Sequence, residues 1–260
     1  MISGNTRNNG PGGKVAVRVL ILGGTGEAHL LARELHKDGR FQVVTSLAGR
    51  TLSPAVPDGG LRVGGFGGAH GLQAFLVAHG IGILINATHP FASQISRNAV
   101  LAARAAKCRH YRLCRPPWSP VAGDVWLDAD DAGHAAQKLR SGTVAFVTLG
   151  QRHLSPFAAR RDVRILARMI EAPAKALPDH ITVIQDRPPF SLPHECRTLA
   201  SHGINVLVSR NAGGHAVAAK LTAARDMGVP VIMIRRPVME ASADAVSAND
   251  MLTLLEHDIT

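Results

Sequence analysis

The stretch LGGTGEA, residues 22–28, decides the fold, because it follows directly on the apolar run VRVLI, residues 17–21. Glycines between a strand and a helix let a phosphate approach the backbone N–H groups of the helix start, which carry partial positive charge. The sequence therefore predicts the first strand, phosphate loop and helix of a nucleotide-binding α/β fold. The alternative interpretation is a tight strand-to-helix turn that holds no ligand.

The loop departs from the pattern G-x-G-x-x-G, because its last small residue is Ala28. We expect the Thr25 hydroxyl to donate a hydrogen bond to the phosphate. Two roles stay open for Glu27, whose carboxylate either stabilises the helix dipole by ~0.3–1 kcal/mol or hydrogen-bonds a ribose hydroxyl. The candidate cofactor-binding residues of the loop are Gly23, Gly24, Thr25, Gly26 and Glu27.

Apolar runs alternate with helical patterns along the whole chain, as in a parallel α/β sheet. The predicted strands are residues 17–22, 42–47, 61–64, 82–87, 109–113, 143–148, 163–168, 181–185, 204–209 and 230–234. The predicted helices are residues 26–38, 70–79, 91–106, 130–140, 193–202 and 214–227. The proline-rich RPPWSP, residues 115–120, continues neither a helix nor a central strand and is typical of a linker. We therefore expect a disordered leader over 1–14 and two α/β domains, over 15–115 and 116–260.

The charge balance favours an anionic partner, because 29 Lys and Arg against 19 Asp and Glu give a formal net charge of +10. The basic residues are scattered, and aromatic residues make up only 4% of the chain, so there is little material for stacking nucleic-acid bases. The composition predicts a small anionic ligand and no nucleic acid.

The cysteines and the N-terminal segment bear on the cellular compartment. Its three cysteines have no C-x-x-C spacing, which predicts neither a disulfide scaffold nor a zinc ribbon and favours a reducing cytoplasm. The polar start, MISGNTRNNGPGGK, does not resemble a signal peptide, and no run approaches the ~18 apolar residues that span a bilayer. We expect a cytoplasmic protein with no membrane partner. The sequence does not define the oligomeric state, and a monomer is plausible.

The end of the second predicted strand bears on cofactor choice. Proteins that prefer NAD usually place an acidic residue there for the ribose 2′-hydroxyl. This strand continues instead into TSLAGR, residues 45–50, where Ser46 and Arg50 match a 2′-phosphate. The sequence therefore predicts NADPH as the cofactor, the alternative being that Arg50 is an exposed, solvated side chain.

Other catalytic arrangements are excluded by spacing. The only tyrosine is Tyr111 and position 115 is arginine, so the Tyr-x-x-x-Lys pair of short-chain dehydrogenases is absent. The sequence has no G-x-S-x-G elbow, no H-E-x-x-H motif and no evident metal ligand set. A bound cofactor would therefore carry the chemistry.

Three further turns are predicted where strands end and ligands bind in open α/β sheets. They are NATHPFA (residues 86–92), TLGQRH (148–153) and SRNAGG (209–214). Pro90 suits the first helical turn, with Thr88 or His89 as a cap; the alternative is a cap with an incidental histidine. The candidate residues for an anionic substrate are Thr88, His89, Pro90, Thr148, Gly150, Arg210, Asn211, Gly213 and Gly214.

These motifs, in this order over residues 17–237, resemble the precorrin-6A reductase family of cobalamin biosynthesis. The resemblance implies NADPH-dependent reduction of a macrocycle double bond of precorrin-6A to give precorrin-6B. It also implies two Rossmann-like halves, with the cofactor on the first half and the tetrapyrrole in a cleft between the halves. The family often has Asp and Lys where this chain has Asn86 and Arg210. Neither difference removes the proposed anion site.

The implied substrate agrees with the residue-level interpretation, because a precorrin carries many carboxylates that a basic protein would bind. His89 is the candidate for orienting this substrate or for delivering the proton that hydride transfer requires, with water as the alternative donor. The rival functional hypothesis is a non-catalytic NADP-binding regulatory module. The glycine turns of the second half argue against it, because a one-ligand sensor has no use for them.

Overall fold

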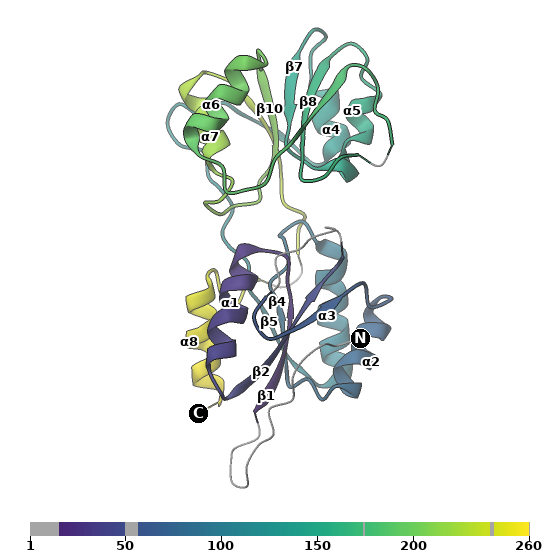
Figure 1. The fold of residues 1–260 in the computed structure, drawn as a ribbon, viewed down its shortest axis with the longest axis vertical. Coiled ribbons are helices and arrows are strands. Elements are labelled where there is room, and N and C mark those ends of the chain that lie inside the picture. Colours follow the sequence, from purple (N-terminus) through teal and green to yellow (C-terminus); the bar gives the residue numbers. More distant parts are fainter. Residues whose placement is uncertain (1–15, 50–56, 174, 240–241, 260) are drawn as a thin grey trace. The chain divides into compact units, whose positions relative to one another are not determined.

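The computed structural model describes residues 16–49, 57–173, 175–239 and 242–259 (Figure 1). The chain forms two compact units, one made of Met1–Arg115 with Val238–Thr260 and the other of Pro116–Pro237. The leader expected over residues 1–14 lies outside the described residues.

The first unit is built on a parallel sheet with the strand order β3-β2-β1-β4-β5. Its strands are β1 (Val17–Leu22), β2 (Phe41–Leu47), β3 (Gly60–Val63), β4 (Ile83–Asn86) and β5 (Arg109–Arg112). All four residues of β4 are buried, as are the last four of β1, because helices cover both faces of a parallel sheet.

Two helix pairs sandwich this sheet (Figure 1). On one face lie α1 (Gly26–Lys37) and α8 (Ala248–Ile259), and on the other α2 (Ala69–Ala78) and α3 (Ser93–Ala106). Side chains alternate along β1, so Val19 and Ile21 join the core under α1 and α8, whereas Leu20 and Leu22 join the core under α2 and α3.

The placement of the C-terminal segment corrects the expected second domain of residues 116–260. Residues 238–260 belong to the first unit, where Met251 and Leu255 of α8 are fully buried in one core with Leu31 and Leu35 of α1. Burial of each large side chain on the apolar face of α8 contributes a free energy of about 1.5–3 kcal/mol. This burial holds the segment there.

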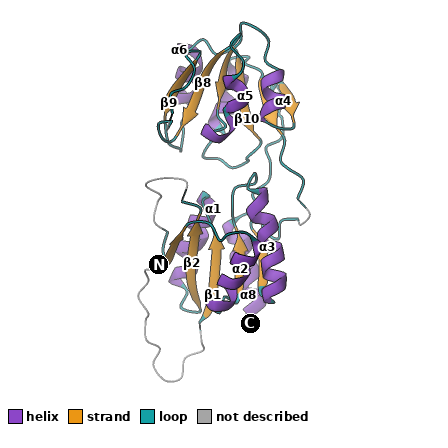
Figure 2. Ribbon diagram, turned by 90° about the vertical axis from the view of Figure 1, so that its right-hand side faces the viewer, coloured by secondary structure: helices purple, strands orange, loops and turns teal. Residues whose placement is uncertain are grey.

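The second unit is built on a six-stranded parallel sheet with the order β6-β11-β10-β7-β8-β9. The strands are β6 (Trp126–Ala129), β7 (Val144–Val147), β8 (Arg164–Met169), β9 (Ile181–Gln185), β10 (Val206–Arg210) and β11 (Val231–Ile234). Two helix pairs again cover the two faces: α6 (Leu192–Ser201) with α7 (Ala219–Asp226), and α4 (Ala132–Gln137) with α5 (Ser155–Ala158) (Figure 1; Figure 2 shows the same unit turned by 90°). The α/β class with two parallel-sheet halves is thus confirmed.

Local differences from the predicted elements lie mostly in this second unit. The helix predicted over 214–227 begins only at Ala219, because Gly213 and Gly214 have positive φ angles and the chain turns through residues 216–218. In this unit the elements β6, α5 and the 3₁₀ turn Gln151–His153 were not predicted, and in the first unit α8 was not predicted.

Each sheet has one point where its strand order reverses. In the first sheet the chain runs outward from β1 to β2 and β3, and then from β4 to β5 on the other side. In the second sheet, β7 leads to β8 and β9, whereas β10 leads to β11. Ligands of open parallel sheets bind beyond the carboxyl ends of the two strands that flank such a point. Residues that follow β1 and β4, and those that follow β7 and β10, therefore form the candidate sites.

Candidate functional site

The glycine loop has the geometry of a phosphate cradle. The Gly23 N–H donates to the Ser46 carbonyl at 3.0 Å, and a Cβ on Gly23 would lie 2.8 Å from Thr45 Cγ2, so the loop packs against β2. Gly24 has a φ of 104°, which favours glycine. A Cβ at Gly24 or at Gly26 would meet no described atom within 4 Å. Open space therefore lies against the start of α1, where N–H groups have no partner inside the helix.

Thr25 also has an internal role that the sequence did not predict. Its hydroxyl oxygen accepts from the Ala28 N–H at 3.1 Å as the N-cap of α1, and the hydroxyl donates to the Ala87 carbonyl at 2.8 Å. In this structure the hydroxyl proton is therefore used within the protein. Thr25 ties the loop after β1 to the turn after β4.

Glu27 forms an ion pair that neither of its two expected roles included. Arg115 Nη1 donates to Glu27 Oε2 at 2.7 Å, and both side chains are more than two-thirds buried. The pair lines a small pocket at the strand-order reversal, together with Thr25, Ala87, Thr88, Pro90, Leu113 and Cys114. The pocket joins the two turns that the sequence singled out in this half of the chain.

Ser46 is buried at the end of β2, where its hydroxyl accepts from Arg62 Nη1 at 3.3 Å. Arg62, from β3, also donates to the Gly64 and Gly65 carbonyls, and its guanidinium lies 3.7 Å from the centre of the Phe66 ring. Arg50 lies outside the described residues. The expected pair of Ser46 and Arg50 is therefore described only at Ser46, which already has an arginine neighbour.

The turn after β4 is held by its own side chains. The Asn86 amide oxygen accepts from the Thr88 hydroxyl at 2.7 Å and from the Thr88 N–H at 3.3 Å. His89 Nδ1 accepts from the Phe91 N–H at 3.2 Å, so the neutral imidazole carries its proton on Nε2. Pro90 lies in a turn and not in the first helical turn, because α3 begins at Ser93 with Ala92 as its N-cap, so neither Thr88 nor His89 caps it.

In the second unit, the predicted residues gather where β7 and β10 end side by side. The Thr148 hydroxyl and N–H both donate to the Val208 carbonyl, each at 3.0 Å. Gly150 has a φ of 76° and starts the 3₁₀ turn that carries His153, which lies 3.5 Å from Arg210 Nη1. The structure thus brings Thr148, Gly150 and Arg210 together.

Asn211, Gly213 and Gly214 hold a neighbouring segment of the same unit in place. The Asn211 side chain accepts from the Trp118 N–H at 2.8 Å and donates to the Trp118 carbonyl at 2.9 Å. The Gly214 carbonyl accepts from the Trp118 indole at 3.1 Å. Gly213 has a φ of 68°, and a Cβ there would overlap the Pro116 carbonyl oxygen. The amide oxygen of Asn211 and one N–H of its NH2 group are therefore used within the protein.

Lys220 is a residue of this site that the sequence analysis missed. It lies in the first turn of α7, is only 6% exposed, and donates from Nζ to the Thr148 hydroxyl oxygen at 3.0 Å. Burial, together with the positive charges of Arg168 and Arg210, lowers the pKa of the Lys220 ammonium to about 7, although the Glu195 carboxylate opposes the shift.

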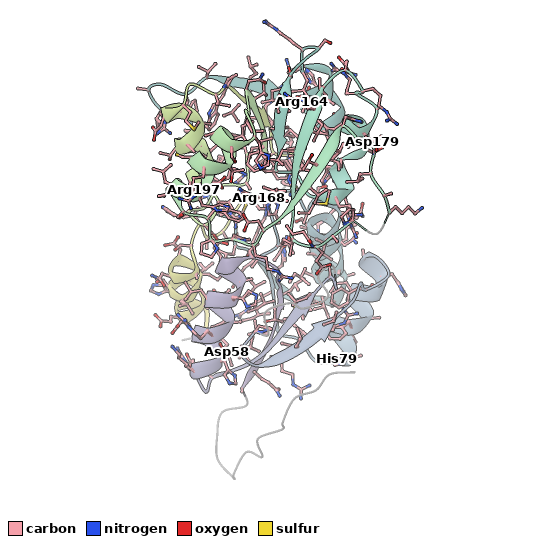
Figure 3. The ribbon with its side chains drawn as sticks, turned by 45° about the horizontal axis from the view of Figure 1, so that its top comes forward. Asp58, His79, Arg164, Arg168, Asp179 and Arg197 are labelled. Carbon is pink, nitrogen blue, oxygen red and sulfur yellow. The ribbon has the colours of Figure 1, made fainter. Side chains whose placement is uncertain are left out.

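A buried ion pair joins the sheet of the second unit to α6. Arg168 of β8, labelled in Figure 3, donates from both terminal nitrogens to the two carboxylate oxygens of Glu195 on α6, at 2.7 and 2.8 Å. Glu195 is fully buried, and the Arg168 guanidinium lies over the rings of Phe146 and Phe190. Such a bidentate pair fixes α6 against the sheet.

The missed residues had weak signals in the sequence. Lys220 stands three and four positions before Ala223 and Ala224, on the buried face of its helix, where a lysine is unusual. Glu195 likewise shares the buried face of α6 with Thr198 and Leu199. A charged residue on an apolar helix face is the pattern that would have found both.

Within the described residues, no three His, Cys, Asp or Glu side chains are grouped so that they could hold a metal ion. No helix in the same part of the chain has the length and apolar character needed to cross a membrane.

The chain is similar to a known protein family. The family model described as "Precorrin-6x reductase CbiJ/CobK" matches residues 18–256. The chain belongs to this family. Membership makes this chain an oxidoreductase and implies a nicotinamide cofactor.

Curated relatives extend over most of the chain. The precorrin-6A reductase of Rhodococcus erythropolis is 44% identical over 230 residues, which are 88% of this chain and 93% of the relative. That of Rhodobacter capsulatus is 40% identical over 242 residues, 92% of this chain and 93% of the relative. A cobalt-precorrin-6A reductase of Priestia megaterium is 27% identical over 239 residues, 85% and 91% of the two chains.

A solved structure, "CobK precorrin-6A reductase", superposes on this precorrin-6x reductase with a TM-score of 0.88 at 37% identity. The match covers 93% of this chain and 96% of the solved chain. The two Rossmann-like halves are therefore a property shared with an experimentally determined relative.

Proposed function

We propose that this precorrin-6x reductase catalyses the NADPH-dependent reduction of precorrin-6A to precorrin-6B in cobalamin biosynthesis. The observation that carries the proposal is the open helix start at Gly24 and Gly26, placed at the strand-order reversal of a chain that matches the family over residues 18–256. Such a helix start binds the pyrophosphate of a dinucleotide.

The first unit is proposed to bind the cofactor. Gly23, Gly24 and Gly26 place the pyrophosphate against the N–H groups of α1. Ser46 and Arg50 remain the proposed contacts of a 2′-phosphate, and Arg62, bonded to Ser46 at 3.3 Å, adds positive charge at the same strand end. Glu27 acts by fixing Arg115 beside the loop.

The second unit is proposed to bind the tetrapyrrole carboxylates. Arg210 supplies a guanidinium, and Thr148 and Gly150 form the turn beside it. The bound nicotinamide supplies a hydride to one carbon of the macrocycle, and the neighbouring carbon needs a proton. His89 stays a candidate for that proton, since its Nε2 carries the hydrogen in the neutral ring.

The metal-free macrocycle is the proposed substrate. Relatives named precorrin-6A reductase are 37–44% identical to this chain, whereas those named cobalt-precorrin-6A reductase are 27–29% identical. The reaction is proposed to take place in the cytoplasm, where the free thiols of Cys108, Cys114 and Cys196 stay reduced.

Cofactor selectivity tests the first-unit assignment. Arg50→Ala should weaken NADPH binding by about one to two decades, because a charge-assisted contact to phosphate contributes roughly 1.5–3 kcal/mol. NADH binding should barely change, since NADH has no 2′-phosphate. Titrations of both cofactors measure this, with Arg33→Ala on the exposed side of α1 as the matched control. Equal losses for NADPH and NADH would contradict the assignment.

A further inference from the structure

Lys220 stands at the strand-order reversal of the second sheet with a polar head that the fold does not fully use. Its Nζ donates to Thr148 Oγ1, at the end of β7. Lys220 as a whole is only 6% exposed. An ammonium has three donors, and the Thr148 bond is the one hydrogen bond of Nζ within the described residues. A buried amine directed at a ligand-binding edge is rarely kept for packing alone.

The charges around Lys220 do not neutralise it. Three charged side chains act on it: Glu195 from α6, Arg168 from β8 and Arg210 from β10. The one carboxylate among them is already bound at both oxygens by Arg168. The amine therefore stands beside two guanidinium groups and is easily deprotonated, with a pKa of about 7.

An aromatic ring covers the amine. The Trp118 ring centre lies 5.7 Å from Nζ, and the bonds of Trp118 to Asn211 and Gly214 fix the ring there. This cover limits contact of Nζ with water and leaves Thr148 as its polar neighbour.

The Thr148 hydroxyl connects the buried amine to the ligand-binding edge of the sheet. Thr148 is only partly buried, its oxygen accepts from Lys220, and its own proton is donated to the Val208 carbonyl. Rotation of that O–H bond directs the proton to a ligand beyond the carboxyl end of β7, while Lys220 replaces it.

We propose that Lys220 is the acid of the reduction and that the Thr148 hydroxyl passes its proton to the macrocycle. The inference rests on the proposed function. NADPH gives a hydride, with both electrons, to one carbon of the double bond and leaves as NADP⁺. The adjacent carbon takes the Thr148 proton, the Thr148 oxygen takes one from the ammonium, and the neutral amine is later reprotonated by water.

Kinetics of paired variants test the relay. Lys220→Met and Thr148→Val remove the acid and the hydroxyl with little change in volume, and each should lower kcat by about 10²–10⁴-fold with a much smaller change in KM. Thr148→Ser keeps the hydroxyl and should recover most of the loss. Lys138→Met, at an exposed lysine of the same unit, is the control.

The pH profile separates the acid from a structural lysine. An acid must be protonated, so kcat/KM of the unaltered protein should fall as the pH rises through about 7, the pKa of Lys220 in the free protein. This fall should be missing in Lys220→Met. If His89→Ala removes it and Lys220→Met keeps it, the proton comes from His89 and the proposal is overturned.

A titration without substrate keeps the test independent of the proposed function. With ¹³Cε-labelled lysine, the NMR signal that disappears in Lys220→Met should titrate near pH 7, and a midpoint above pH 9 would overturn the proposal. If the unaltered protein does not reduce precorrin-6A but this signal titrates near pH 7, the proposed function fails while the perturbed lysine stands. If the protein reduces precorrin-6A and Lys220→Met keeps its kcat, only the relay fails.

Discussion

Glu195→Gln should lower the free energy of unfolding of the second unit by about 3–5 kcal/mol, because removal of one partner leaves a buried charge uncompensated. Glu195 is fully buried and binds Arg168 through both carboxylate oxygens. Glutamine keeps the shape but loses the charge, so the buried Arg168 guanidinium would lose its bidentate partner and keep only Asp186, 3.7 Å from its Nε, as a carboxylate neighbour.

The two tryptophans make this measurement specific. Trp118 and Trp126 are the only tryptophans in the sequence, and both lie in the second unit, so intrinsic fluorescence during urea denaturation reports on that unit. Asp162→Asn, which breaks the surface pair with Arg160, is the control and should shift the midpoint far less. Equal midpoints for Glu195→Gln and Asp162→Asn would show that the buried pair does not support the unit.

Gly26→Val should abolish measurable cofactor binding while the protein stays folded. Gly26 is the first residue of α1, its φ lies outside the left-handed region, and a Cβ there meets no described atom within 4 Å, so a side chain is compatible with the backbone at this position. The branched side chain would fill the space proposed for the pyrophosphate. Loss of two charge-assisted hydrogen bonds, at roughly 1.5–3 kcal/mol each, corresponds to at least ~100-fold weaker binding.

The matched control stands at the other end of the same helix. Gly39 follows α1, and a Cβ there also meets no described atom within 4 Å. Gly39→Val should therefore bind NADPH as the unaltered protein does. Fluorescence titration with NADPH and thermal melting of both variants make the comparison. A folded Gly26→Val protein with unaltered affinity would place the cofactor elsewhere.

The positions of most strands and of the glycine loop in the sequence could be predicted, because both depend on local patterns. Apolar runs next to glycine turns identify β1, β4, β7 and β10, and the two strand-order reversals bring their ends together. The helix α8 was missed although it has a local signal, since Ser247 and Asp250 form a reciprocal cap at its start. Its packing against α1 links residues more than 200 positions apart, and periodicity alone does not reveal that contact.

Individual side-chain roles were harder to predict, because they depend on partners distant in sequence. The Thr25 hydroxyl bonds to a carbonyl 62 residues away, and Asn211 bonds to a backbone 93 residues away. A motif shows that a polar residue stands at a strand end, but not whether a distant part of the fold already uses its hydrogen bonds. The same limitation concealed Lys220, whose partner Thr148 lies 72 positions before it.

Anaerobic incubation of the purified protein with precorrin-6A and NADPH tests the central claim most directly, when the nicotinamide and tetrapyrrole absorbances are followed together. We expect both spectra to change in step, with about one NADPH oxidised for each macrocycle reduced, since one double bond takes one hydride. Gly26→Val should show neither change. Tight NADPH binding by the unaltered protein, with both spectra constant in the presence of precorrin-6A, would show that the protein does not reduce precorrin-6A and would favour a non-catalytic NADP-binding module.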